Sequence, residues 1–116
     1  GSLKHAGKKT VSELIDLKLE KTSYFEELDR EKTIEALAAA THQYSLAIIK
    51  RHAFVICTSE DGQTRYIFDP DKGTFMAQSD EEFKNVLTSI VNRYLKIDKT
   101  QTVTLYNATP IERRNS

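Results

Sequence analysis

The residues that could do chemistry in this chain lie on either side of a turn signal, Glu60-Asp61-Gly62. His52 opens a stretch rich in β-branched and aromatic residues, and Asp69 closes a second such stretch after the turn. Two stretches of this kind with a turn between them predict a β-hairpin. A carboxylate that binds one nitrogen of an imidazole fixes the ring tautomer and leaves the other nitrogen free to accept a proton. His52 and Asp69 could therefore act as a general base and its orienting carboxylate.

The pairing register decides whether the two side chains meet, because successive residues of a strand point to opposite faces of the sheet. If Thr58 pairs with Gln63 across a four-residue loop, paired positions sum to 121 and His52 lies opposite Asp69. If Asp61-Gly62 forms a tight turn instead, the sum is 123 and the pair are diagonal neighbours on one face. A three-residue loop would separate them, leaving a strand-end histidine and a turn-opening aspartate. We expect a loop with an even number of residues, which places both side chains on one face.

The segments around the pair form an extended pattern. They read His52-Ala-Phe-Val-Ile, then Tyr66-Ile-Phe-Asp69-Pro-Asp-Lys-Gly73-Thr-Phe75, then Glu82-Phe83. This pattern resembles the C-terminal half of papain-like cysteine proteases, most closely the bacterial effector proteases of the YopT/AvrPphB type, over about residues 44–107. Asp71 stands where that family usually has Asn. Bacteriocin-processing peptidases, which are also papain-like, show a similar His…Asp-Pro…Gly pattern.

The resemblance implies a papain-like subdomain in which His52 is the general base and Asp69 orients it. It also implies a hydrolase or acyl-transfer enzyme, with protease, deamidase and acyltransferase activities all open. By the same resemblance, the protein is expected to be a secreted bacterial effector, a toxin or virulence factor acting on a host protein in the host cytoplasm; otherwise we expect a reducing cytoplasmic compartment. The alternative is a non-enzymatic, pseudoprotease-like interaction domain.

The resemblance does not supply a nucleophile, which in this family is a cysteine that precedes the histidine and caps a helix. The single cysteine, Cys57, lies five residues after His52 on the same predicted strand. The odd offset points Cys57 to the other sheet face, about 17 Å away, so we interpret it as a buried apolar residue. Gly1-Ser2 resembles a tag remnant, so a cysteine-bearing segment could precede residue 3 in the natural protein. Alternatively, the domain is a degenerate relative that binds without cutting, or Ser12 takes the place of the cysteine.

Composition limits the remaining function classes. The 116 residues allow one domain, which we place at 10–110, between a basic N-terminus at 1–9 and a polar tail at 111–116. Lys+Arg and Asp+Glu both number 17, which argues against a nucleic-acid binder. No apolar run approaches the ~20 residues of a membrane span. Lys4, Lys8 and Lys9 signal contact with a membrane surface too weakly, so membrane contact is not expected. One cysteine excludes an intrachain disulfide and zinc sites built from several cysteines.

No metal or cofactor site is predicted. His5 and His42 have no partner at the spacing of metal ligands. Asp69 and Asp71 resemble half of an acidic calcium loop, but the following segment, 73–78, has no carboxylate to complete it.

The supporting elements are predicted from hydrophobic periodicity and turn residues. Helices are expected from Thr10 through Leu19, from Asp29 to Ala40 and from Ser79 to Leu95. Strands are expected over 44–49, 53–58, 64–68 and 102–106, the last ending before Pro110. The segment 21–28 is expected to join the first two helices, with a short turn over 23–26.

The third helix has the clearest pattern. Ser79 and Glu82 have the spacing of a capping box. Six apolar residues then recur at helical spacing: Phe83, Val86, Leu87, Ile90, Val91 and Tyr94. Together with the strands, this helix predicts an α+β domain with a mostly antiparallel sheet and flanking helices.

Overall fold

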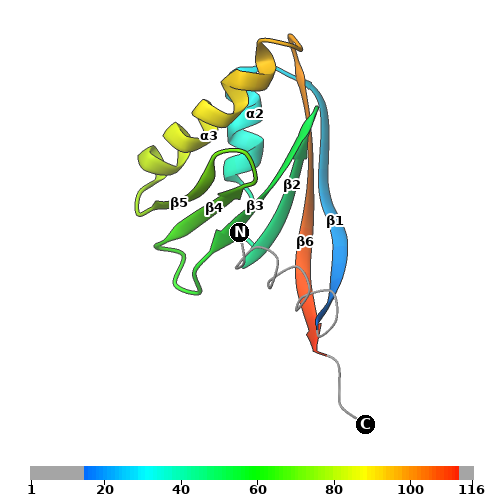
Figure 1. The fold of residues 1–116 in the computed structure, drawn as a ribbon, viewed down its shortest axis with the longest axis vertical. Coiled ribbons are helices and arrows are strands. Elements are labelled where there is room, and N and C mark those ends of the chain that lie inside the picture. Colours follow the sequence, from blue (N-terminus) through cyan, green and yellow to red (C-terminus); the bar gives the residue numbers. More distant parts are fainter. Residues whose placement is uncertain (1–14, 113–116) are drawn as a thin grey trace.

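Six strands and two helices occupy the part of the chain that the computed structural model describes, residues 15–112 (Figure 1). In chain order they are β1 (Ile15–Leu28), α2 (Arg30–Ala38), β2 (Tyr44–Ile49), β3 (His52–Thr58), β4 (Arg65–Asp69), β5 (Gly73–Ala77), α3 (Asp80–Leu95) and β6 (Gln101–Glu112). The strands form one sheet in the order β1-β6-β2-β3-β4-β5, and all neighbours are antiparallel. The predicted α+β class with an antiparallel sheet is confirmed.

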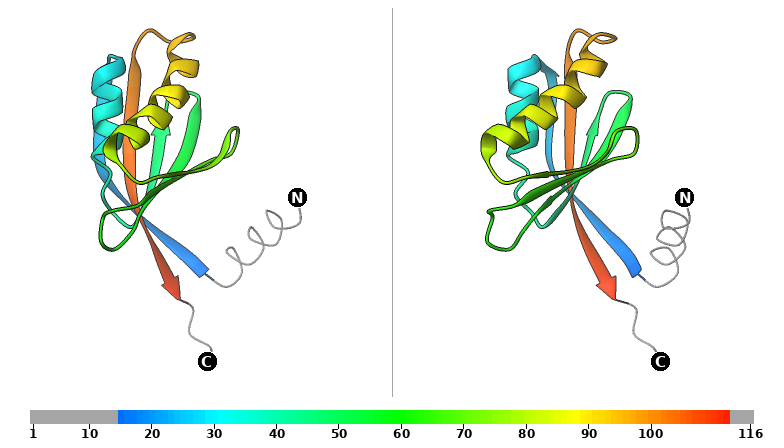
Figure 2. Two further views of the ribbon diagram at one scale, coloured as in Figure 1. Left: turned by 90° about the vertical axis from the view of Figure 1, so that its left-hand side faces the viewer. Right: turned by 60° about the vertical axis from the view of Figure 1, so that its left-hand side comes forward.

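Both helices lie on the same face of the sheet (Figure 2). The core fills the space between this face and the helices, with Leu37 from α2 and Phe83 and Leu87 from α3 fully buried. The strands contribute inward-facing residues such as Phe54 and Ile67. In the described part of the chain, neither helix is both long and apolar enough to cross a membrane.

The segment before α2 is a strand, so the helix predicted through Leu19 is wrong from Ile15 onward, as are the joining segment 21–28 and its short turn. The earlier part of that prediction, residues 10–14, lies outside the described residues. β1 pairs along its length with β6, about 70 to 100 positions away in sequence. The segment Thr22–Phe25 is rich in residues that favour strands. Long-range pairing therefore overrides the helical spacing of the apolar residues at its start.

Strand β6 continues through Pro110 to Glu112, beyond the stop predicted before this proline. Pro110 pairs with Leu17 of β1, whereas the pairing of β6 with β2 reaches only Asn107. At Pro110, β6 therefore has a neighbour on one side only. A proline has no N–H to donate, and it is tolerated in a strand where the sheet requires no donor from it.

In the β3–β4 hairpin the paired positions sum to 123, which is one of the two registers that place His52 and Asp69 on one face. Thr58 pairs with Arg65, and Ser59 N donates to Thr64 O at 2.9 Å. Gly62 closes the turn with φ of +74°, a conformation that glycine adopts without strain. The loop is therefore 60–63, one residue later than the four-residue loop of the 121 register.

An additional strand, β5, follows the hairpin and was not predicted. It pairs with β4 from Asp69–Gly73 to Arg65–Ala77. Gly73 begins the strand with φ of +106°, which side-chain-bearing residues rarely adopt. The three residues 70–72 therefore form a tight turn that directs the chain back along β4.

Helix α3 forms as predicted. Ser79 Oγ accepts from Glu82 N at 3.1 Å, and the Glu82 carboxylate accepts from Gln78 N at 2.8 Å. Five of the six predicted stripe residues are buried, and Val86 packs against them half-buried. Helix α2 is capped by Asp29, whose side chain accepts from Lys32 N.

Candidate functional site

His52 and Asp69 form a hydrogen bond of 2.8 Å between Nε2 and Oδ2. His52 opens β3 and Asp69 ends β4, so the 123 register makes them diagonal neighbours on the helix-covered face. The prediction that they share one face is therefore confirmed. Their side chains are only 5% and 1% exposed, which removes the competition of water for this contact.

The Asp69 carboxylate is held from both oxygens. Oδ1 accepts from the backbone N–H groups of Asp71 at 2.7 Å and Lys72 at 3.1 Å, while Oδ2 binds His52. Burial alone would raise the pKa of Asp69, but the hydrogen bonds from His52 and from the two N–H groups outweigh it and lower the pKa. Asp69 is therefore an ionised and oriented acceptor at neutral pH.

Two aromatic rings enclose the imidazole. The Tyr94 ring of α3 stacks on His52 with centroids 4.7 Å apart and planes 15° apart. Phe54 lies near the ring at 5.8 Å and 28°. Stacking fixes the plane of the imidazole, and the hydrogen bond to Asp69 directs Nε2 toward the carboxylate within that plane.

Asp71 lies beside the other nitrogen of the ring. Its Oδ2 is 3.6 Å from His52 Nδ1 and accepts a hydrogen bond of 3.0 Å from the Tyr94 hydroxyl. Burial and this hydrogen bond to Asp71 raise the pKa of Tyr94, so its hydroxyl remains a donor well above neutral pH.

Neither Asp71 nor Tyr94 was predicted at the site from the sequence. In the sequence, Asp71 is notable only because it stands where the family usually has Asn and because, with Asp69, it resembles half of a calcium loop. Its two-residue spacing from Asp69 was a usable signal, because a tight turn brings such residues to one end of a hairpin. Tyr94 was assigned only to the core stripe of α3, and no local feature indicates that its ring reaches His52.

The three residues His52, Asp69 and Asp71 offer ligand atoms within 4.8 Å of one another, a spacing at which a metal ion could be considered. The carboxylates, however, lie at different ring nitrogens, Asp69 at Nε2 and Asp71 at Nδ1. A metal bound to one nitrogen lone pair would face only one of them. Asp69 also already accepts from three donors. The arrangement favours a hydrogen-bonded pair over a metal centre.

Cys57 lies on the opposite face of the sheet from His52, as predicted, but it is half-buried, so the prediction of a buried residue is wrong. No helix of the described chain covers that face (Figure 2). Cys57 lines a groove of about 290 Å³ there with Tyr44, Tyr66 and Phe68. Partial burial raises the pKa of the thiol, which lowers its thiolate fraction at neutral pH. Cys57 cannot serve His52 as a nucleophile.

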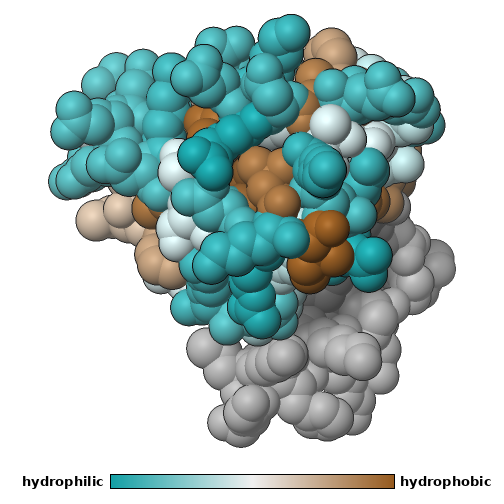
Figure 3. All heavy atoms as spheres, turned by 90° about the horizontal axis from the view of Figure 1, so that it is seen from above, coloured by the Kyte–Doolittle hydropathy of each residue, from teal (hydrophilic) through white to brown (hydrophobic). Residues whose placement is uncertain are grey.

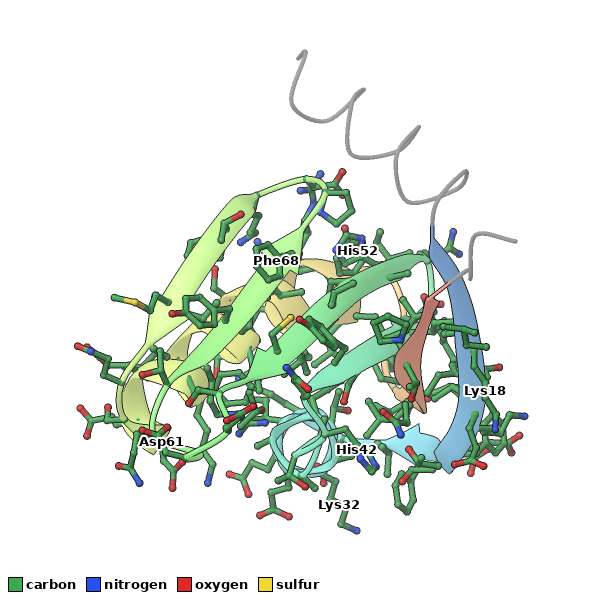
Figure 4. The ribbon with its side chains drawn as sticks, turned by 90° about the horizontal axis from the view of Figure 1, so that it is seen from below. Lys18, Lys32, His42, His52, Asp61 and Phe68 are labelled. Atoms are coloured by element: carbon green, nitrogen blue, oxygen red, sulfur yellow. The ribbon has the colours of Figure 1, made fainter. Side chains whose placement is uncertain are left out.

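Of the remaining candidates, His42 lies in the described part of the chain, and it does not approach the pair. His42 is exposed in the segment between α2 and β2, away from His52 (Figure 4). Ser12 and His5 lie outside the described residues. Viewed from the end at which α3 terminates, the surface is mainly hydrophilic, with small apolar patches between polar side chains (Figure 3).

No family model, no curated protein and no solved structure matches this chain significantly.

Proposed function

We propose that His52 and Asp69 are the general base and orienting carboxylate of a papain-like acyl-transfer site. The observation that carries this proposal is their buried hydrogen bond of 2.8 Å. With Nε2 bound to Asp69, Nδ1 is the nitrogen that can take a proton from a thiol. The order of elements supports the papain-like assignment: a His-bearing strand, an Asp-Pro turn, a helix and a closing strand correspond to β3, the end of β4, α3 and β6.

The proposed reaction follows from these roles. His52 Nδ1 removes the thiol proton, and the sulfur attacks the substrate carbonyl carbon to form a tetrahedral adduct. The imidazolium returns the proton to the departing amine as the carbon–nitrogen bond breaks. Water or a second amine then attacks the thioester and releases the acyl group. Asp69 maintains the tautomer and stabilises the imidazolium throughout.

The proposal requires a thiol from outside the present sequence, because Cys57 faces the other side of the sheet. We propose that a cysteine-bearing segment preceding these residues in the natural protein, or a partner chain, supplies it at a helix N-terminus. A host protein as substrate and secretion as a bacterial effector rest on the family resemblance alone and remain predictions.

The test compares the complete gene product with its variants in hydrolysis of a fluorogenic peptide library. We expect His52→Ala to lower the rate by about 10²-fold or more, as loss of a general base does, and Asp69→Asn to lower it by at least ~10-fold. Cys57→Ser should leave the rate unchanged. Hydrolysis that survives His52→Ala would contradict the proposal, as would the absence of any thiol-dependent hydrolysis or acyl transfer.

A specific observation also favours the alternative, a pseudoprotease-like interaction domain. Large apolar side chains are exposed on the sheet face without helices, with Phe68 at 42% and Met76 at 57% exposure. A surface of this kind suits contact with another protein. A gene product that lacks hydrolysis but loses a protein partner on Phe68→Ser would favour this alternative.

A further inference from the structure

The imidazole of His52 has no freely open edge. Asp69 binds Nε2, Tyr94 and Phe54 lie against the ring, and Asp71 lies 3.6 Å from Nδ1. As a result, only 5% of the side chain is exposed, although the proposed reaction needs Nδ1 to receive a proton from an incoming group.

Among these four neighbours, Asp71 alone is substantially exposed. Its side chain is 49% exposed, whereas Phe54, Asp69 and Tyr94 are buried. Moving Asp69 would break its contacts with three donors, and moving either aromatic ring would disturb the core. Asp71 can therefore leave the ring at the lowest cost in broken contacts.

While the imidazole is neutral, His52 does not hold Asp71 in place. When Nε2 carries the proton shared with Asp69, Nδ1 bears a lone pair, so two acceptors face each other at a distance too long for a hydrogen bond. The side-chain contact that holds Asp71 is the hydrogen bond of 3.0 Å from the Tyr94 hydroxyl. The nearby cations bind elsewhere: Arg51 pairs with Asp98, and Lys72 donates to Ser89.

We infer that Asp71, anchored by the Tyr94 hydroxyl, is a gate over His52 Nδ1, and that a hydrogen-bond donor reaches this nitrogen only by displacing Asp71. The inference deepens the proposed function, on which it rests for the identity of the donor as a thiol. A thiol that hydrogen-bonds to Nδ1 replaces the unfavourable contact between two acceptors. The site is therefore closed until its correct partner binds.

The experiment measures how fast diethyl pyrocarbonate modifies His52 in the folded chain, with the exposed His42 as an internal standard. Both histidines are modified in the same sample at one pH, and the ratio of the two rates reports access to the His52 ring. In the wild type we expect His52 to react more slowly than His42. Tyr94→Phe keeps the stacked ring and removes the hydroxyl that anchors Asp71. It should raise the ratio of the His52 rate to the His42 rate roughly fivefold, because the loss of one hydrogen bond shifts the displacement of Asp71 by about that factor. Asp71→Ala should raise it at least as much.

Asp98→Ala is the matched control, because it removes a carboxylate that pairs with Arg51 rather than lying beside the ring. Near-UV circular dichroism verifies that each variant is folded. Should Asp71→Ala prove unfolded, Tyr94→Phe decides alone. The gate is overturned if folded Tyr94→Phe and Asp71→Ala have the same ratio of modification rates as the wild type. It is also overturned if Asp98→Ala raises this ratio as much as they do. A gated His52 in a gene product without hydrolysis would refute only the proposed function, whereas hydrolysis with an ungated His52 would refute only the gate.

Discussion

Lys72, in the turn between β4 and β5, donates from Nζ to Ser89 on α3, at 2.7 Å to Oγ and 3.2 Å to the carbonyl oxygen. The backbone N–H of the same Lys72 donates to Asp69. One residue thus connects the orienting carboxylate with the helix that carries Tyr94. The geometry of the pair therefore depends on how α3 packs against the sheet.

Truncation of the apolar stripe on α3 should destabilise the whole domain. Leu87 is fully buried, and Leu87→Ala should lower the free energy of unfolding by about 2–5 kcal/mol. Lys84, which is exposed on the same helix, provides the control, and Lys84→Ala should change it by less than ~0.5 kcal/mol. Urea unfolding followed by circular dichroism measures both. Equal midpoints for the two variants would show that the stripe is not the core face.

Asp69 should make the domain sensitive to acid. Its pKa is lower in the folded than in the unfolded state, where a carboxyl has about 3.9. Its stabilising contribution is therefore complete above that unfolded value and is lost as pH falls through the lower folded value. Asp69→Asn should be less stable at neutral pH and should lose part of the decline in acid. The measurement is the urea midpoint between about pH 7 and pH 2.5; parallel curves for wild type and variant would contradict it.

The tautomer of His52 should be set by Asp69. Because Asp69 accepts from Nε2, neutral His52 should carry its proton on Nε2, with Nδ1 unprotonated. Long-range ¹H–¹⁵N NMR spectra distinguish the two tautomers. His42 is exposed and serves as the reference in the same spectrum. An Nδ1–H tautomer in the wild type would require another assignment for the general base.

Cys57 should react slowly with disulfide reagents in the native state. Partial burial raises its pKa, so less thiolate is present at neutral pH than for an unperturbed cysteine. We expect a rate at least ~10-fold below that of the unfolded chain in urea, which is the internal reference. The rate should rise with pH as the thiolate fraction increases. Equal rates with and without urea would show that the aromatic groove leaves the thiol fully accessible.

Gly73 should be required to close the turn next to Asp69. Its φ of +106° is unfavourable for any residue with a Cβ, although no atom beyond the adjacent residues lies within 4 Å of the position where a Cβ would be. Gly73→Ala should therefore cost about 1–3 kcal/mol through backbone strain alone. Gly62→Ala, at φ of +74° and equally free of contacts, should cost only about 1–2 kcal/mol. Chemical denaturation of both variants tests this order, and a smaller loss in Gly73→Ala than in Gly62→Ala would contradict it.

The parts of the fold that depend on neighbouring residues could be predicted from the sequence. The capping box of Ser79 and Glu82 and the apolar spacing after it determine α3, because a helix is stabilised by contacts within three or four positions. The turn signal at Gly62 favours a two- or four-residue loop, and either loop places His52 and Asp69 on one face. The candidate pair could therefore be identified without a structure.

Only the tertiary structure decided the remaining features. Ile15–Leu28 is a strand because β6 pairs with it, and this partner lies too far along the sequence for local periodicity to reveal it. Tyr94 reaches His52 because α3 packs at one angle on the sheet, and Asp71 reaches Nδ1 because the turn at 70–72 is tight. Cys57 is half-buried because the described helices cover only the other face. The hairpin and its turn thus bring His52 and Asp69 to one face, whereas long-range packing determines what surrounds them.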